Sequence, residues 1–236
     1  MVLLKRTARP IVIGGSFLPF IGLLLCHHIP VVTISAAAGK MTGMTSAHTH
    51  QEISFQQVLI EDSSVFSIQW TVLSVSIAAA LSPENVLKRY LAYIRSCTFS
   101  LIRPLELETG IEFRLFDSSW SLINFYPASF EGDSSTLRIC GGLLVQPRQC
   151  DRGEFRFTVE RVPDGVRVAL QLSEFCPLIL GGSSPSLIRF WLYRLTQAAI
   201  HQLVTVRFLK LLYRELAGSA AAVKLVKVAV RNGRPV

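Results

Sequence analysis

The sequence SLIRFWLYRLTQAAIHQLVTVRFLKLLYRELA, residues 186–217, is long and mostly apolar. Apolar residues recur in it at helical spacing, which predicts one long closing helix. At about 100° per residue, one face of this helix collects apolar side chains. These are Ile188, Leu192, Leu195, Ala199, Leu203 and Val206, with Trp191, Ala198 and Leu209 on the flank. Burying a large apolar side chain contributes roughly 1.5–3 kcal/mol, so we expect this face to pack against a sheet.

The clearest sheet signal lies just before this helix, in residues 155–173. Apolar and polar residues alternate there on both sides of Pro163-Asp164-Gly165. An Asp-Gly pair favours a tight turn, and alternation with a period of two gives each strand one wet and one dry face. We therefore predict an antiparallel hairpin whose dry face includes Phe155, Phe157, Val168 and Leu170.

Further strands are predicted upstream. Short polar turns separate Ile111–Asp117, Ser119–Tyr126 and Thr136–Gln146. Gly141-Gly142 inside the last of these indicates a bulge, a sharp bend or a split strand. A segment rich in β-branched and aromatic residues predicts one more strand from Val65 to Ala80.

A first helix is predicted after that strand. Ser82 can cap it, Pro83 suits its first turn, and Glu84 favours its positive end. Apolar residues at helical spacing carry this helix to about Phe99.

The stretch Ile77-Ala78-Ala79-Ala80-Leu81, followed by Ser82-Pro83-Glu84-Asn85-Val86-Leu87, resembles a strand entering the first helix of the helix-grip superfamily. This superfamily includes START lipid-transfer domains, birch-pollen-allergen-like proteins and polyketide cyclases. The resemblance covers residues 65–217 and implies an α+β fold, in which a curved antiparallel sheet wraps around a long C-terminal helix. It also implies a hydrophobic cavity and six strands after the first helices, whereas we count five from Ile111 to Phe175. No single activity follows, because the superfamily contains carriers, sensors and enzymes.

The expected ligand site lies between the dry sheet face and the closing helix. Its residues are Phe155, Phe157, Val168 and Leu170 from the sheet, and Trp191, Leu195, Gln202, Val206 and Lys210 from the helix. A buried lysine without a partner is costly, so Lys210 meets an anionic group at the pocket mouth, reaches water or lies beyond the sheet. Arg194, Gln197 and His201 fall on the opposite helix face, and we expect His201 to face solvent.

Three functions are compatible with these patterns. The first is noncatalytic binding or carriage of an apolar small molecule or lipid in the cavity. The second is a cyclase or other lyase-type enzyme, which needs an acid or base facing the cavity; Glu174, Asp117, Tyr126 and Lys210 are the candidates. The third is a membrane-associated accessory protein. We expect no cofactor and no metal, since no cysteine pair has zinc-site spacing and His48 with His50 supplies too few ligands.

The net charge of +8 comes entirely from residues 186–236, which hold nine Lys or Arg against Glu215 alone. Such a basic end attracts phosphate groups. Nucleic acid is not expected, because no nucleic-acid-binding motif is present. An anionic membrane surface is the better partner, since Leu211, Leu212 and Val223 lie among the charges. A solvated helix end with a frayed tail is the alternative, and no oligomeric state is indicated.

The chain divides into a targeting segment or membrane anchor at residues 1–38, a linker at 39–52, the helix-grip domain at 53–217 and a basic tail at 218–236. Lys5, Arg6 and Arg9 precede an apolar run from Ile11 to Leu25, and no acidic residue occurs before Glu52. This pattern is typical of a secretory or organelle-targeting segment, which predicts an exported or organellar protein. A membrane anchor at residues 11–34 is the alternative.

Four cysteines follow the targeting segment: Cys97, Cys140, Cys150 and Cys176. They could form two disulfides in an oxidising compartment or remain buried thiols.

Overall fold

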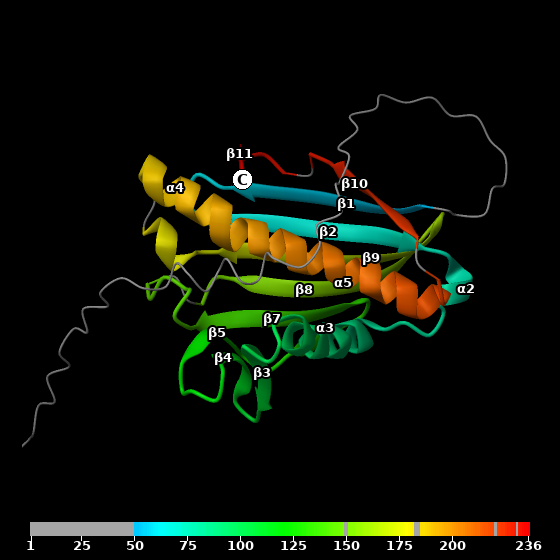
Figure 1. The fold of residues 1–236 in the computed structure, drawn as a ribbon, viewed down its shortest axis with the longest axis horizontal. Helices are drawn as coiled ribbons and strands as arrows, with labels where there is room; N and C mark the ends of the chain where they lie inside the picture. The colour runs from blue at the N-terminus through cyan, green and yellow to red at the C-terminus, as the bar shows by residue number, and fades with distance from the viewer. Residues whose placement is uncertain (1–49, 149–150, 182–184, 220, 230) are drawn as a thin grey trace, which may run out of the picture. The chain divides into compact units, whose positions relative to one another are not determined.

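The computed structural model describes residues 50–148, 151–181, 185–219, 221–229 and 231–236. This part of the chain has an α+β fold, in which a long C-terminal helix crosses one face of a curved, mostly antiparallel sheet (Figure 1). The predicted helix-grip arrangement is therefore confirmed. The predicted targeting segment or membrane anchor at 1–38 and most of the predicted linker lie outside the described residues. None of the helices in the described ranges reaches the length and hydropathy that a bilayer crossing needs.

The main path of the sheet runs β10-β1-β2-β9-β8-β7-β5-β4-β3. Its strands are β1 (His50–Leu59), β2 (Val65–Leu73), β3 (Ile102–Leu107), β4 (Gly110–Leu115), β5 (Ser121–Phe125), β6 (Ser129–Glu131), β7 (Ser134–Gly141), β8 (Glu154–Val162), β9 (Gly165–Phe175), β10 (Ala222–Lys227) and β11 (Arg234–Pro235). The predicted hairpin is β8–β9, which pairs in register from Val162 opposite Gly165 outward.

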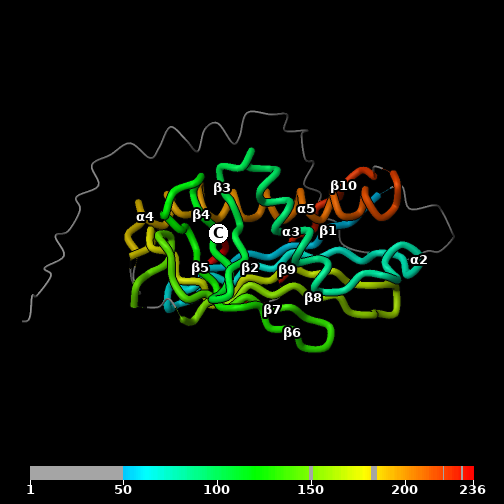
Figure 2. Tube along the Cα trace, turned by 90° about the horizontal axis from the view of Figure 1, so that it is seen from below, coloured from blue at the N-terminus to red at the C-terminus, as the bar shows by residue number. Residues whose placement is uncertain are grey.

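The sheet bends after β7, at the predicted Gly141-Gly142 pair. Gly142 has φ 121°, and a Cβ atom there would lie 2.5 Å from the carbonyl oxygen of Leu122. A glycine is therefore required where the backbones approach so closely. The strand predicted to run from Thr136 to Gln146 is split here, since β7 ends at Gly141. Beyond this point β5, β4 and β3 turn toward the side of the sheet that carries α3 and α5 (Figure 2).

The prediction of a strand through Ala80 is wrong. β2 ends at Leu73, and Val75–Ala78 forms a short helix, α2, whose Ile77 and Ala78 amides donate to the Ser74 carbonyl. Alanine has the highest helix propensity, so the alanine-rich stretch is poorly suited to extend a strand. The part of the family resemblance that rested on Ile77–Leu81 as a strand therefore fails, although the fold class holds.

The first predicted helix is α3 (Pro83–Cys97), which ends two residues before the expected boundary. The Ser82 hydroxyl accepts the Asn85 amide at 3.2 Å and caps its start. One face of α3 is buried on the sheet, through Val86, Leu87, Tyr90, Leu91 and Ile94. A 3-10 turn, η1 (Leu178–Leu180), then leads from the sheet toward the closing helix.

Residues 218–236, which the sequence predicts to form a basic tail, instead contribute two strands to the sheet. β10 pairs in parallel with β1, and β11 pairs with the other end of β1 in antiparallel fashion. Val223 and Leu225 are half-buried, and their apolar contacts with the core hold the segment on the sheet. β1 itself begins at His50, so the last three residues of the predicted linker belong to the sheet.

The predicted closing helix is confirmed as one continuous element made of α4 (Leu187–Tyr193), a π-helical turn η2 (Arg194–Ala198) and α5 (Ala199–Ala217). The predicted inward face is wrong. Ile188 is 80% exposed and Leu195 67% exposed. The buried residues are instead Phe190, Tyr193, Ala198, Thr205, Phe208, Leu209 and Leu212. Periodicity identifies the most apolar side of a helix, but the partner decides which side is buried, and much of β1 and β2 beneath this helix is polar.

Candidate ligand site between the sheet and the last helix

An aromatic cluster fills the region where β8 and α3 meet α5. The ring of Tyr90 lies 5.2–5.3 Å from the rings of Phe155, Phe157 and Phe208. Phe155 and Phe157 are 4.6 Å apart, centroid to centroid. These centroid distances are typical of aromatic rings that pack directly against one another in a protein core. The four predicted sheet residues, Phe155, Phe157, Val168 and Leu170, do come together here, and all are buried.

Of the five predicted helix residues, Val206 is partly buried and packs against this core, whereas Trp191, Leu195 and Lys210 do not join it. Trp191 and Leu195 are exposed on the far side of the helix, Lys210 is exposed, and Gln202 and Val206 are partly exposed. Lys210 lines a groove of about 330 Å³ between α3 and α5, together with Tyr93, Arg207, Leu211, Arg214 and Ala221. Lys210 therefore lies away from the dry face of the β8–β9 hairpin.

A second region beneath the helix, over β1 and β2, is polar. Gln57, Ser67 and Gln69 are each 3% exposed or less. The Gln69 Nε2 donates to Ser67 Oγ at 2.8 Å, and the Gln57 Nε2 reaches the carbonyl oxygen of Ala198 at 3.5 Å. The latter contact fixes the side of the sheet on which these residues lie. It is the side covered by the last helix.

The helix contributes three polar residues to the same region. The Tyr193 side chain is hydrogen-bonded to Gln57. His201 lies with its ring 5.9 Å from that of Phe155. Gln197 belongs to the π-helical turn between the two contacts. We call Gln57, Ser67, Gln69, Tyr193, Gln197 and His201 the polar cluster.

Strand register places these residues along one line across the sheet. Gln57 is paired with Ser67, Ser67 with Leu172, and Leu172 with Phe155. The side chains of directly paired residues lie side by side on one face. His201 above Phe155 and Ala198 above Gln57 therefore cover two ends of the same cross-strand row.

His201 contradicts its sequence-based prediction, because it faces the sheet and not solvent. Its Nε2 is sealed from solvent and has no hydrogen-bond partner among the described residues. Burial lowers the pKa of the imidazole to about 4, so His201 is neutral at pH 7. A neutral imidazole offers one donor and one acceptor nitrogen.

Gln197 and Gln69 share this lack of partners. Their Oε1 atoms are buried, and neither has a hydrogen-bond partner among the described residues. Leaving such a group unsatisfied costs roughly 1–3 kcal/mol, and buried polar groups in native proteins are nearly always paired. Both atoms are acceptors, so the cluster has an excess of acceptors and is complementary to a donor.

The π-helical turn adds an independent sign of function at this place. Gln197 and Ala198 both lie in it, and the Thr196 hydroxyl bonds back to the Leu192 carbonyl at 2.6 Å. Single π-helical turns inside α-helices occur frequently at functional sites. Sequence reasoning missed this feature because no residue pattern identifies a π turn.

The alternation of polar and apolar residues in β2 is visible in the sequence, but it indicates the wrong face of the strand as the buried one. In β2 the inward residues include Ser67, Gln69 and Thr71, whereas the alternate set includes the more apolar Phe66, Ile68 and Trp70. Period-two alternation would assign the apolar set to the core. Phe66 is instead covered from outside by the guanidinium of Arg231, 5.3 Å from its ring.

A cleft of about 310 Å³ lies at the ends of β1 and β2, beside α2. It is lined by Gln51 and Thr71 among others, and Tyr213 contributes from α5. The Gln51 Nε2 donates to the Leu209 carbonyl at 3.1 Å, which ties β1 to the helix next to the cleft. Its volume is at the lower end of the range for ligand pockets.

The acid and base candidates lie at the surface. Asp117 pairs with Arg103 and is 81% exposed, and Glu174 is 53% exposed and 3.8 Å from Arg152. Tyr126 is 47% exposed. None of these three is part of the aromatic or the polar region beneath the helix.

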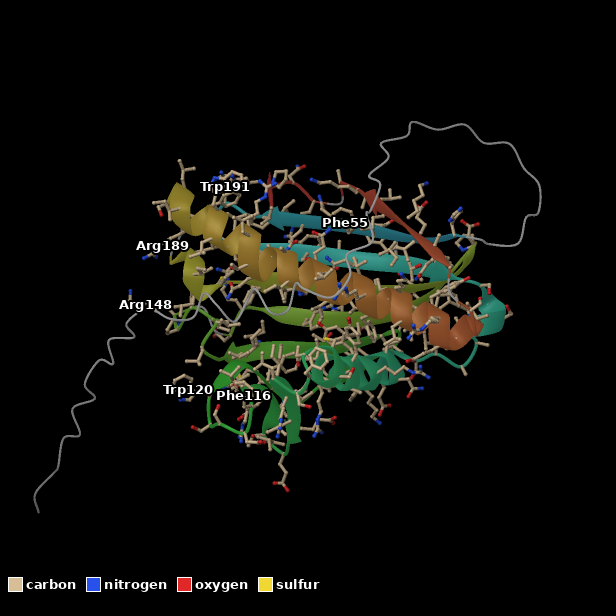
Figure 3. All side chains as sticks on the ribbon, in the orientation of Figure 1. Phe55, Phe116, Trp120, Arg148, Arg189 and Trp191 are labelled. Atoms are coloured by element: carbon tan, nitrogen blue, oxygen red, sulfur yellow. The ribbon has the colours of Figure 1, made fainter. Side chains whose placement is uncertain are left out.

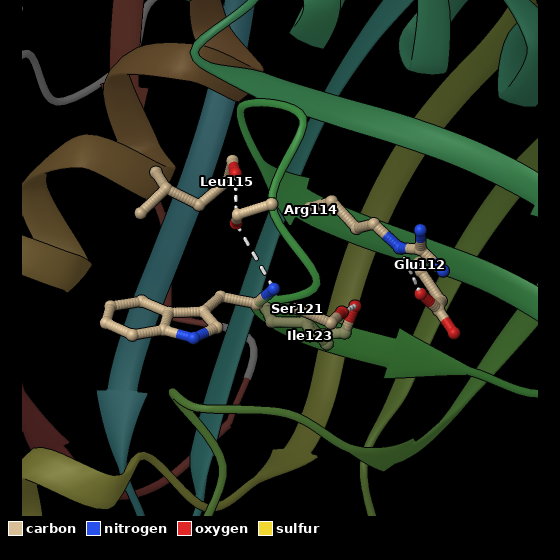
Figure 4. Close-up of polar contacts among 7 residues, drawn as sticks. Glu112, Arg114, Leu115, Ser121 and Ile123 are labelled. Atoms are coloured by element: carbon tan, nitrogen blue, oxygen red, sulfur yellow. Dashed lines mark hydrogen bonds and ion pairs between the residues drawn. The ribbon is translucent and has the colours of Figure 1, made fainter.

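The hairpin beside Asp117 is held together locally. The Ser118 hydroxyl donates to the Leu115 carbonyl at 2.5 Å and accepts the Trp120 amide at 3.2 Å, and the Arg114 Nε lies 2.6 Å from the Glu112 Oε2 (Figure 4). The charges of β4 are therefore paired with one another on the hairpin.

Among the described residues there is no group of three or more His, Cys, Asp or Glu that could hold a metal ion. Cys97 and Cys176 are free thiols, so the two-disulfide alternative is not formed. Burial raises the pKa of both thiols. Cys150 and His48 lie outside the described residues.

The class of domain is thus a helix-grip α+β domain with a polar cluster under its last helix. No protein-family model matches the chain, and no curated protein matches it. Among solved structures it is similar to CalU16 from Micromonospora echinospora, with 14% identity over 52% of this chain and 68% of that chain. The TM-score is 0.28. At that score the likeness carries no argument, and the fold class rests on the elements described above.

Proposed function

We propose that this domain binds or carries a small, mostly apolar molecule or lipid that bears a hydrogen-bond donor. The molecule lies between the last helix and β1–β2, beside the polar cluster. The observation that carries the proposal is the set of partnerless buried atoms: His201 Nε2, Gln197 Oε1 and Gln69 Oε1.

The chemistry of the surroundings supports this choice. Apolar walls with a few convergent polar groups are typical of small-molecule sites. Phe155 and Leu172 flank the polar cluster along the sheet. A hydroxyl or amine on an otherwise apolar molecule would satisfy the acceptors, while its apolar part would pack against these walls.

The binding is proposed as noncatalytic. General acid–base catalysis needs a titrating group within reach of the substrate. The candidate carboxylates are paired or exposed away from the cluster, and His201 stays neutral over the physiological range. No observation favours a cyclase or lyase reaction over binding.

The test is ligand retention by the full chain. The protein is incubated with a lipid extract, and the retained molecules are identified by native mass spectrometry. We expect a mostly apolar molecule with a hydroxyl or amine at one copy per chain. Replacing an acceptor by an apolar side chain of similar size, as in Gln69→Leu or Gln197→Leu, should weaken its binding about tenfold, the effect of one hydrogen bond of about 1.4 kcal/mol.

Gln202→Leu is the matched control. It makes the same chemical change on the same helix, but Gln202 is not in the polar cluster, so binding should be unchanged. Retention of nothing, or equal retention by all three variants, would contradict the proposal. If Gln69→Leu and Gln197→Leu raise the free energy of unfolding, and no ligand is retained, the two acceptors have no partner in the folded domain and the proposal fails.

A further inference from the structure

The outward side of the last helix carries an unusual set of exposed apolar residues. Five large side chains project from α4 and the start of η2. We call them the apolar stripe: Leu187 (67% exposed), Ile188 (80%), Trp191 (49%), Leu192 (39%) and Leu195 (67%). Single exposed apolar residues are ordinary, but a contiguous group marks a surface that contacts protein or membrane.

Arginines border this stripe on both sides. At about 100° per residue the five apolar side chains fall within an arc of about 140°, with Arg194 just beyond one limit and Arg189 beyond the other. Trp191 and Arg189 lie on different sides of α4 in Figure 3. The Arg194 guanidinium is 5.0 Å from the centroid of the Trp191 ring. An apolar stripe with Trp at its centre and cations at its borders is typical of helices that lie in a membrane interface.

The same side of the helix continues as a basic surface. Arg207, Lys210 and Arg214 are exposed on α5, opposite the buried Thr205, Phe208 and Leu212. No acidic residue occurs from Ser186 to Arg214. Glu215, which follows, is paired with Arg89 at 2.7 Å. The outward side thus changes from apolar to cationic along one straight element.

We infer that the last helix docks this domain on an anionic lipid surface. The apolar stripe enters the headgroup region, and Arg207, Lys210 and Arg214 contact lipid phosphates. Charge decides between a membrane and a second copy of the chain. Pairing two identical cationic surfaces is opposed by repulsion, whereas phosphatidylserine supplies the complementary charge. This surface is distinct from the 218–236 segment, because β10 is a strand of the sheet.

The experiment is co-sedimentation of the full chain with phosphatidylcholine vesicles, with and without phosphatidylserine. We expect binding that is stronger with phosphatidylserine and weakens with salt. Ile188→Ser with Leu195→Ser should reduce binding at least tenfold to both kinds of vesicle. The triple change Arg207→Gln, Lys210→Gln and Arg214→Gln should remove the preference for phosphatidylserine. Phe99→Ser is the matched control, since Phe99 is 88% exposed but lies on the turn after α3.

Trp191 reports on insertion directly. The chain has three tryptophans. A blue shift of the emission on vesicle binding should be lost in Trp191→Phe and kept in Trp120→Phe. This readout separates insertion of the stripe from retention by any other part of the chain.

Three results would overturn the inference. Vesicle binding that is unaffected by Ile188→Ser with Leu195→Ser would place the contact elsewhere. A dimer in light scattering that dissociates in that variant, with no vesicle binding, would make a second copy the occupant. Cross-linking of Ile188→Cys to residues 1–49 in a full chain that binds no vesicles would make the chain's own N-terminal segment the occupant.

Discussion

In the first half of the last helix, polar residues face the sheet and apolar residues face outward, which is the reverse of a typical amphipathic helix. Inward, its first half places Tyr193, Gln197 and His201 against the sheet. Outward, the same half exposes Ile188 and Leu195. Only in α5 does the usual order return, with Phe208, Leu209 and Leu212 buried. The surface that a helix packs against therefore decides which of its residues are buried in this domain. The buried polar residues and the exposed apolar residues both belong to the first half of the last helix.

The largest expected effect contrasts two apolar residues on opposite sides. Phe208 is 2% exposed and packs against Tyr90 and Tyr93, so Phe208→Ala should lower the free energy of unfolding by about 3–5 kcal/mol. Leu195→Ala removes an exposed side chain and should change it by no more than about 0.5 kcal/mol. Urea unfolding with an unchanged slope measures both. Equal losses in the two variants would show that the stripe is buried in solution.

The next effect is a dependence of stability on pH that arises from His201. The pKa is lowered to about 4 in the folded state from an ordinary 6.5, so the unfolded chain binds the proton first as the pH falls. The contribution of His201 to the free energy of unfolding is fully present above pH 6.5. It falls by up to about 3 kcal/mol as the pH falls toward 4. His201→Leu should flatten the dependence of the urea-unfolding free energy on pH in this window. A profile unchanged by His201→Leu would place the imidazole in water.

A smaller effect concerns the hydrogen bond between Tyr193 and Gln57. Tyr193→Phe keeps the ring but removes the hydroxyl, and should lower the free energy of unfolding by about 1 kcal/mol. Gln57→Leu should remove most of that difference in a double-mutant cycle. Tyr126→Phe makes the same change at an exposed position and serves as the control. Additive effects of Tyr193→Phe and Gln57→Leu would mean that the two side chains do not interact.

The smallest effect is on the outward side. Arg194→Gln removes the cation above Trp191 and should lower the free energy of unfolding by about 0.5–1 kcal/mol at most, the range for exposed cation–π contacts. The emission of Trp191 should change with it, because the charge next to the indole is lost. A loss as large as that of Phe208→Ala would mean that Arg194 has a structural role inside the domain.

Elements with a strong local signal could be predicted from the sequence. The β8–β9 hairpin, the capped α3, the closing helix and the break at Gly141-Gly142 all depend on turn chemistry and periodicity within a few residues. The helix-grip fold class followed from their order. The four sheet residues of the expected site, Phe155, Phe157, Val168 and Leu170, do gather under the helix.

The helix side of the site could not be predicted, because periodicity gives the direction of the apolar side but not its partner. Trp191 and Leu195 satisfy the pattern for a core-facing stripe and yet are exposed. The polar cluster depends on β1 and β2 together, and β1 was missed because its inward residues include Gln51 and Gln57. β10 was missed because its pairing with β1 joins residues 172 positions apart, as in Glu52 and Lys224.

The pairing of β10 and β11 with β1 governs how this chain can be shortened. Residues at the extreme C-terminus reach back to the first strand, and the Val236 amide donates to the Gln57 carbonyl at 3.3 Å. Cutting the chain at Gly218 would uncover the hydrogen-bonding groups of β1, and an open strand edge is a template for aggregation. Expression variants should therefore keep the final residues, and any affinity tag there needs a spacer that leaves them free to pair.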